Sequence, residues 1–141
     1  MNKKVWLGFI VTFVAFAALD AFGDNVVLKS GMMSISNMLR PQAELEANVW
    51  IFLVSFAVFA YFFSWIFSKG YEGKGILEGI RYGAAVGLMF NVPFFFIYYA
   101  WMPFPFSFML AGFLYWMLIF VVLGMLVAWV FGMKPKGQAQ A

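Results

Sequence analysis

Four apolar runs constrain this chain more than any other feature. They cover about residues 5–22, 47–67, 80–101 and 106–131. At ~1.5 Å per residue the shortest run reaches ~27 Å and the longest ~39 Å, against a bilayer core of ~30 Å. Hydrophobic residues make up 65% of the 141 residues and charged residues only 11%, a balance unusual for a soluble domain. We therefore predict an all-α membrane protein, a single domain over 1–141 with four transmembrane helices in an antiparallel bundle.

The segments outside the runs are unequal in length. Residues 23–46 form the only long connection, and their part from 26 to 40 mixes apolar and polar residues. This part suits either a short interfacial helix or an ordinary structured loop. The polar tail, 134–141, is expected to be disordered. The first run has the basic start and small residues of a signal peptide, but its length and the three later runs favour an uncleaved span.

The basic residues predict the orientation of the spans. With the N-terminus inside, seven would lie on the inner side and two, Lys29 and Arg40, on the outer side. The seven are Lys3, Lys4, Lys69, Lys74, Arg81, Lys134 and Lys136. This asymmetry predicts an integral membrane protein with both termini cytoplasmic. The net charge of +3 is small and scattered, so membrane lipids are expected partners and nucleic acid is not.

The chain contains neither cysteine nor histidine. Disulfides, thiolate nucleophiles, Cys/His metal sites and a Ser-His-Asp triad are therefore excluded. We predict no catalytic residue, no metal and no cofactor, and hence a non-enzymatic protein. A weaker alternative is a lipid-modifying enzyme that uses Asp20, Glu44 or Glu46, although no pair of these acids has a spacing that argues for catalysis.

Small residues recur every four positions along three of the runs, the GxxxG-like pattern of close helix packing, with Ala60, Ser64 and Ser68 as the weakest series. The expected helix-packing residues are Gly75, Gly79, Gly83, Gly87, Gly124, Ala128 and Gly132. Asn91 takes the next position of the first series. The partner is either another helix of the same chain, which we favour, or a second copy or a larger membrane complex.

Three residues form a candidate polar site inside the apolar runs. Asn91 is expected ~16 Å into the hydrocarbon, near its midplane, and Pro93 frees a backbone carbonyl beside it. Such a pair can bind a polar group, although an asparagine there more often bonds a neighbouring helix. Asp20 is the only acid inside a run, close to its end, where it either carries protons or reaches water. If Asp20 and Asn91 line one path, the chain is a small oligomeric transporter or channel.

Charges and aromatic residues mark the expected interfaces. Lys74, Glu78 and Arg81 are spaced for pairing on a helix surface and suit an anchor or a lipid headgroup site. The aromatic cluster 94–101 fits a belt at the opposite interface.

Motifs in the connections after the first and second apolar runs resemble those of a known group of proteins. The stretch 39–41 (LRP) with Glu44, the turn 69–75 (KGYEGKG), and Glu78-Gly79 with Arg81-Tyr82-Gly83 resemble small uncharacterised bacterial four-span proteins. The resemblance implies a bacterial inner-membrane setting and no particular activity. Our leading functional hypothesis is a non-enzymatic structural or accessory membrane subunit.

Overall fold

The computed structural model describes residues 3–133, and this part of the chain is helical throughout most of its length, without strands. Four helices are long and apolar enough to cross a membrane, which confirms the predicted helical class. The tail predicted to be disordered, 134–141, lies outside the described residues. The four helices are α1 (Lys3–Phe22), α4 (Val49–Gly70), α5 (Ile76–Trp101) and α6 (Phe106–Gly132).

The long connection is a chain of short helical pieces. They are the π-helical turn η1 (Gly23–Val27), α2 (Lys29–Ser34), the 3-10 turn η2 (Ser36–Met38) and α3 (Gln42–Ala47). The stretch 26–40 is thus a structured connection of short helical pieces and not one continuous interfacial helix. Pro41 stands just before α3 with extended backbone (ψ 146°), and the helix begins at Gln42.

The π-helical turn is fixed by one tyrosine of α6. The Tyr115 hydroxyl donates a hydrogen bond of 2.6 Å to the Leu19 carbonyl. Its ring lies where a Cβ at Gly23 would be. The Leu28 N–H then bonds the Gly23 carbonyl five residues back, at 2.7 Å, which is the π-helical spacing. The widened turn carries α1 one turn past the end of the predicted span.

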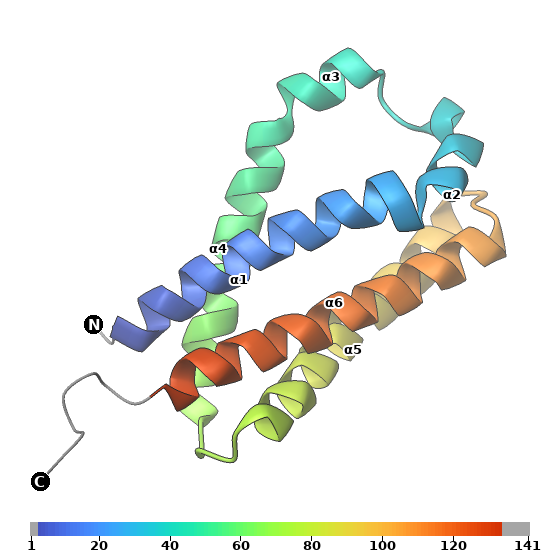
Figure 1. Ribbon diagram of the computed structural model, residues 1–141. Helices are drawn as coiled ribbons and strands as arrows, with labels where there is room; N and C mark the ends of the chain where they lie inside the picture. Colours follow the sequence, from blue (N-terminus) through green and yellow to red (C-terminus); the bar gives the residue numbers. More distant parts are fainter. Residues whose placement is uncertain (1–2, 134–141) are drawn as a thin grey trace, which may run out of the picture.

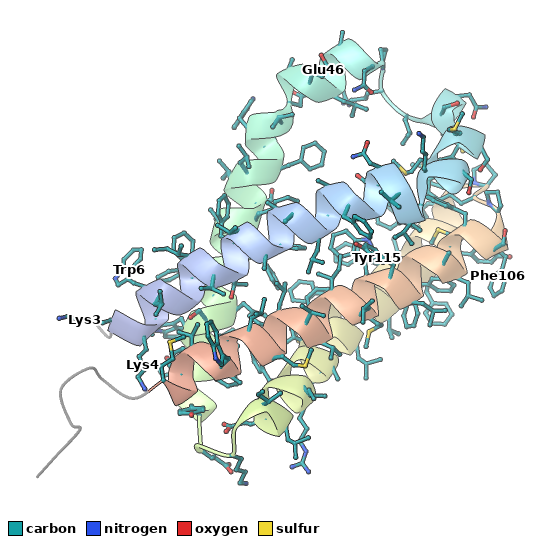
Figure 2. All side chains as sticks on the ribbon, in the orientation of Figure 1. Lys3, Lys4, Trp6, Glu46, Phe106 and Tyr115 are labelled. Atoms are coloured by element: carbon teal, nitrogen blue, oxygen red, sulfur yellow. The ribbon has the colours of Figure 1, made fainter. Side chains whose placement is uncertain are left out.

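The helices pack as two pairs (Figure 1). The hairpin of α5 and α6 is closed by a short turn with two prolines, and α1 contacts both α6 and α4. We call the end of the bundle with Lys3 and Gly132 the near end, and the end with α2 the far end. Lys4 ties the near end together, because its ammonium donates a 2.5 Å hydrogen bond to the Phe131 carbonyl (Figure 2).

The core lies in the near half. All buried residues of α4 lie from Ala60 to Phe67, and those of α5 are Gly79, Gly83 and Gly87. The buried residues of α6 begin at Ile119. The other half of each of these helices has no buried residue, and in Figure 1 the first half of α4 runs away from α1. In the near half small residues bring α5 and α6 together, and aromatic rings such as Phe63, Phe67 and Phe131 fill the core.

Glycine makes the contact of α5 with α6 close. A Cβ at Gly79 would meet the Gly124 carbonyl oxygen, and one at Gly83 would lie 2.9 Å from the Phe120 carbonyl carbon. Ala128 contributes to the same interface, where its Cβ would lie 2.6 Å from one at Gly79. Backbone therefore rests on backbone. A Cβ at Gly87 would touch only side chains of α6, and one at Gly132 would reach no closer than 3.8 Å, to the Tyr71 hydroxyl.

Gly75 differs from the other residues of its series. It precedes α5 instead of lying in it, and a Cβ there would have no atom within 4 Å. Its backbone (φ 75°, ψ −151°) is a conformation that essentially only glycine adopts. Gly75 therefore shapes the turn before the helix and takes no part in packing, which corrects its place among the helix-packing residues.

Candidate functional site

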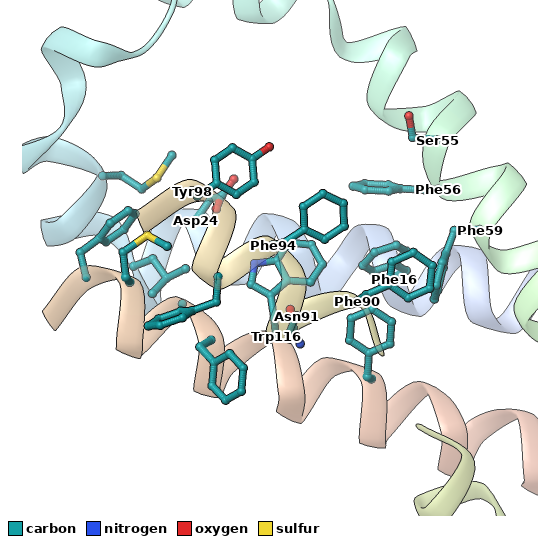
Figure 3. A pocket seen from close by; sticks show the side chains of 18 residues that line it. Phe16, Asp24, Ser55, Phe56, Phe59, Phe90, Asn91, Phe94, Tyr98 and Trp116 are labelled. Carbon is teal, nitrogen blue, oxygen red and sulfur yellow. The ribbon is translucent and has the colours of Figure 1, made fainter. Parts of the chain in front are cut away.

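A cavity of about 480 Å³ opens in the far half of the bundle (Figure 3). Its walls come from α1, the η1 turn and α2 that follow it, the first half of α4, the second half of α5, and α6. Eleven of its 18 lining residues are Phe, Tyr or Trp. The cavity exists because these bulky residues occupy the half of each helix in which close backbone contact is absent.

The aromatic walls support one another by ring contacts between helices. Phe16 of α1 meets Trp116 of α6 edge-on at 5.7 Å and Phe56 of α4 at 4.5 Å. Phe90 of α5 stacks parallel to Phe120 of α6 at 6.1 Å. Ring pairs at these separations are favourable arrangements. All four long helices therefore contribute to one continuous aromatic wall.

Four of the lining residues have polar side chains: Asp24, Ser55, Asn91 and Tyr98. Ser55 donates to the Ile51 carbonyl of its own helix at 2.8 Å. Asn91 is half-buried, and its amide nitrogen is buried without a hydrogen-bond partner among the described residues. An unpaired buried amide nitrogen is costly, which marks Asn91 as a strained position behind the cavity wall.

The structure brings together only part of the predicted polar site. Asn91 lines the cavity, but Asp20 and Pro93 do not. The acid on the cavity wall is Asp24, one turn after Asp20, carried there by the π-helical turn. Sequence reasoning missed Asp24 because it lies just beyond the apolar run. The signal available was its place one helical turn after an acid inside that run.

The other acids considered for chemistry lie elsewhere. Glu44 pairs with Arg40 at 3.1 Å, and Glu46 accepts a hydrogen bond from Gln42, all on the exposed surface of α3 and its start. Figure 1 shows α3 set apart from the end of α1, so Asp20 does not join them. Among residues 3–133 there is no group of three or more acids that could hold a metal ion.

The charged turn at the near end pairs differently from the expectation. The Glu78 carboxylate accepts hydrogen bonds from the backbone N–H groups of Glu72 (2.6 Å) and Lys74 (2.9 Å). The carboxylate therefore accepts its hydrogen bonds from backbone N–H groups of the turn before α5, which lack helical partners. The Lys74 ammonium pairs with Glu72 instead, and this hydrogen bond lowers the pKa of the Glu72 carboxyl. Arg81 is exposed, as an anchor at an interface would be.

These features define the class of protein: a helical membrane protein whose four long apolar helices enclose an aromatic cavity in one half of the bundle. Comparison with models of protein families, with curated proteins and with solved structures found no match to this chain.

Proposed function

We propose that the protein is a non-enzymatic accessory protein of the bacterial inner membrane that binds a lipid-soluble molecule in its far-half cavity. One observation carries the proposal: an aromatic cavity of about 480 Å³ between membrane-spanning helices, with Asn91 among its few polar lining residues. A cavity of this volume lies within the range typical of small-molecule sites, which are mostly apolar with a few polar groups.

The contrast between the two halves of the bundle supports binding. The near half is closed by buried side chains such as Leu123 and Val127, which have no exposed surface. In hydrocarbon, helices associate by such packing, and each unfilled contact is lost dispersion energy. The far half of the bundle lacks this packing, so a molecule bound in its cavity would supply the missing contacts and stabilise it.

The glycine contacts limit where a partner protein could bind. Gly79 and Gly83 already pack against α6 of the same chain. A second copy or a larger complex would therefore use another face, such as the exposed apolar surface of α4. The accessory role that we propose accordingly rests on the cavity and leaves the glycine series to hold the bundle together.

A second candidate function is a small transporter, because Asn91 and Asp24 lie on the wall of one cavity. The packed near half favours a binding protein or an alternating-access carrier over an open channel. Uptake of the bound molecule into proteoliposomes, lost in Asn91→Leu, would distinguish a carrier from a binding protein.

The charges of the described chain support the proposed orientation. Lys3, Lys4, Lys69, Lys74 and Arg81 belong to near-end segments, whereas Lys29 and Arg40 belong to the far-end connection. Basic residues concentrate on the cytoplasmic side of membrane proteins. We therefore propose that the near end is cytoplasmic and that the cavity lies in the outer half of the bilayer.

The experiment compares two tryptophan variants purified from native membranes into lipid nanodiscs. Gly112 lines the cavity and has no atom within 4 Å of a Cβ, so Gly112→Trp places a bulky ring in it. Leu114→Trp adds a ring to an exposed position of the same helix outside the cavity lining. Mass spectrometry should find a small molecule enriched with the wild type and Leu114→Trp and depleted with Gly112→Trp. Equal recovery from all three, in the proportions of the bulk lipid, would refute the proposal.

A further inference from the structure

The cavity lining carries negative charge and no positive charge. Asp24 is its only charged residue, and no lysine or arginine belongs to the lining. Lys29, five residues after Asp24, is not part of it, and Arg40 is paired with Glu44. An anionic group entering this cavity would meet a carboxylate and no cation, so anionic ligands are disfavoured.

The aromatic rings add to this preference. The faces of Phe, Tyr and Trp rings are electrically negative and attract cations, most strongly where water is excluded. Phe94 and Tyr98 stack at 6.0 Å along α5 and are about half exposed, at 50% and 45%. Both line the cavity together with Asp24 (Figure 3). A ligand cation would therefore meet ring surface as well as a carboxylate.

Asp24 belongs to the far-end part of the cavity. It follows the end of α1, and Tyr98 lies near the end of α5, so both come from helix ends on the same side of the bundle. Phe59 and Phe120 close the opposite, deeper part of the cavity with an edge-on ring contact at 5.5 Å. The cavity thus has an apolar inner part and an acidic outer part, which matches a molecule with an apolar body and one positively charged group.

We infer that the cavity selects lipophilic cations, meaning molecules that carry an ammonium or phosphonium group on an apolar body. The inference rests on the proposed binding function and adds the charge of the ligand. Asp24 supplies the charge complement, and the aromatic wall supplies the apolar surface.

The test uses two probes of nearly equal size and opposite charge, tetraphenylphosphonium and tetraphenylborate. Binding of each is measured separately by equilibrium dialysis on the full chain in nanodiscs of uncharged phosphatidylcholine, with empty nanodiscs as background. We expect saturable binding of the cation and none of the anion. Saturable binding of the anion at equal or higher affinity would overturn the inference and leave the proposed function standing. Binding of neither probe above the level of Gly112→Trp would count against both.

Matched acid variants test the role of Asp24. Asp24→Asn should weaken binding of the cation about fivefold, since Asp24 is exposed and an ion pair at an exposed position contributes modestly. Glu44→Gln removes the same charge from an exposed far-end position outside the lining, and should leave the affinity within about twofold of the wild type. Asp24→Glu should restore most of the affinity. Equal effects of Asp24→Asn and Glu44→Gln would show that Asp24 has no specific role and would overturn the inference.

Discussion

Gly83→Ala should separate α5 from α6, and the structure allows the cost to be worked out. A Cβ at Gly83 would come closest to the Phe120 carbonyl oxygen, and would lie 2.9 Å from the carbonyl carbon of the same residue and 3.0 Å from the Val121 Cα, whereas ordinary contact begins at 3.4 Å. All three neighbours are backbone atoms, which cannot turn aside. The helices must therefore move apart by about 1 Å, and a gap of ~0.5–1 Å forfeits a quarter to a half of each dispersion contact.

The contacts at risk give the magnitude. Helices in hydrocarbon associate by packing and not by the hydrophobic effect, so dispersion is the relevant energy. A few dozen atom pairs at ~0.1–0.2 kcal/mol each, losing about a third of their attraction, amount to about 2 kcal/mol. Replacing a helical glycine with alanine returns up to ~1 kcal/mol through helix propensity, so the net destabilisation is about 1–2 kcal/mol.

A matched variant isolates the packing cost. Gly112 is also a glycine inside a long helix, but a Cβ there has no atom within 4 Å. Gly112→Ala should therefore gain the propensity without the clash. Unfolding by sodium dodecyl sulfate in mixed micelles, followed by circular dichroism, should separate the two variants by about 2 kcal/mol. A Gly83→Ala variant as stable as Gly112→Ala would refute the close contact of α5 with α6.

Three further predictions use the same purified protein. Gly75→Ala should lower the free energy of unfolding by ~1–3 kcal/mol because of its backbone conformation, while Gly70→Ala, whose Cβ would touch nothing, should change it little. Lys74→Ala should raise the pKa of Glu72, which NMR titration measures. Because the pKa of Glu72 is lowered in the folded protein, the pair stabilises the fold above the ordinary glutamate pKa. This stabilisation is lost as the pH falls through the lowered pKa of Glu72. Tyr115→Phe should cost about 0.5–1.5 kcal/mol in the unfolding assay, because it leaves a carbonyl of α1 without its hydrogen bond.

Much of the fold could be predicted from the sequence, because hydrocarbon imposes a simple length rule. The runs at 80–101 and 106–131 correspond to α5 and α6 within a few residues at most ends. The four-residue spacing of small residues was also informative where both series lie inside helices, as at Gly79 and Gly124. The spacing rule holds only inside a helix. Gly75 has the right spacing but precedes α5, so the rule wrongly predicts a packing role for it.

The cavity could not be predicted, because it depends on how far the helices diverge. Phe16, Phe59 and Trp116 are far apart in the sequence, and each alone is typical of a lipid-facing position. They become one wall only because α4 departs from α1 in the far half. Asp24 was missed for a related reason, since a π-helical turn held by Tyr115 extends α1 beyond its apolar run.

The central claim is that the chain crosses the membrane four times and holds its cavity in the outer half. Because the chain lacks cysteine, single cysteines at Lys3, Gln42, Gly70 and Met102 can report the side of each segment without background. In intact cells a membrane-impermeant maleimide should label positions 42 and 102, and should reach 3 and 70 only after the membrane is opened. Labelling of positions 3 and 70 in intact cells, or of 42 and 102 on opposite sides, would contradict the account.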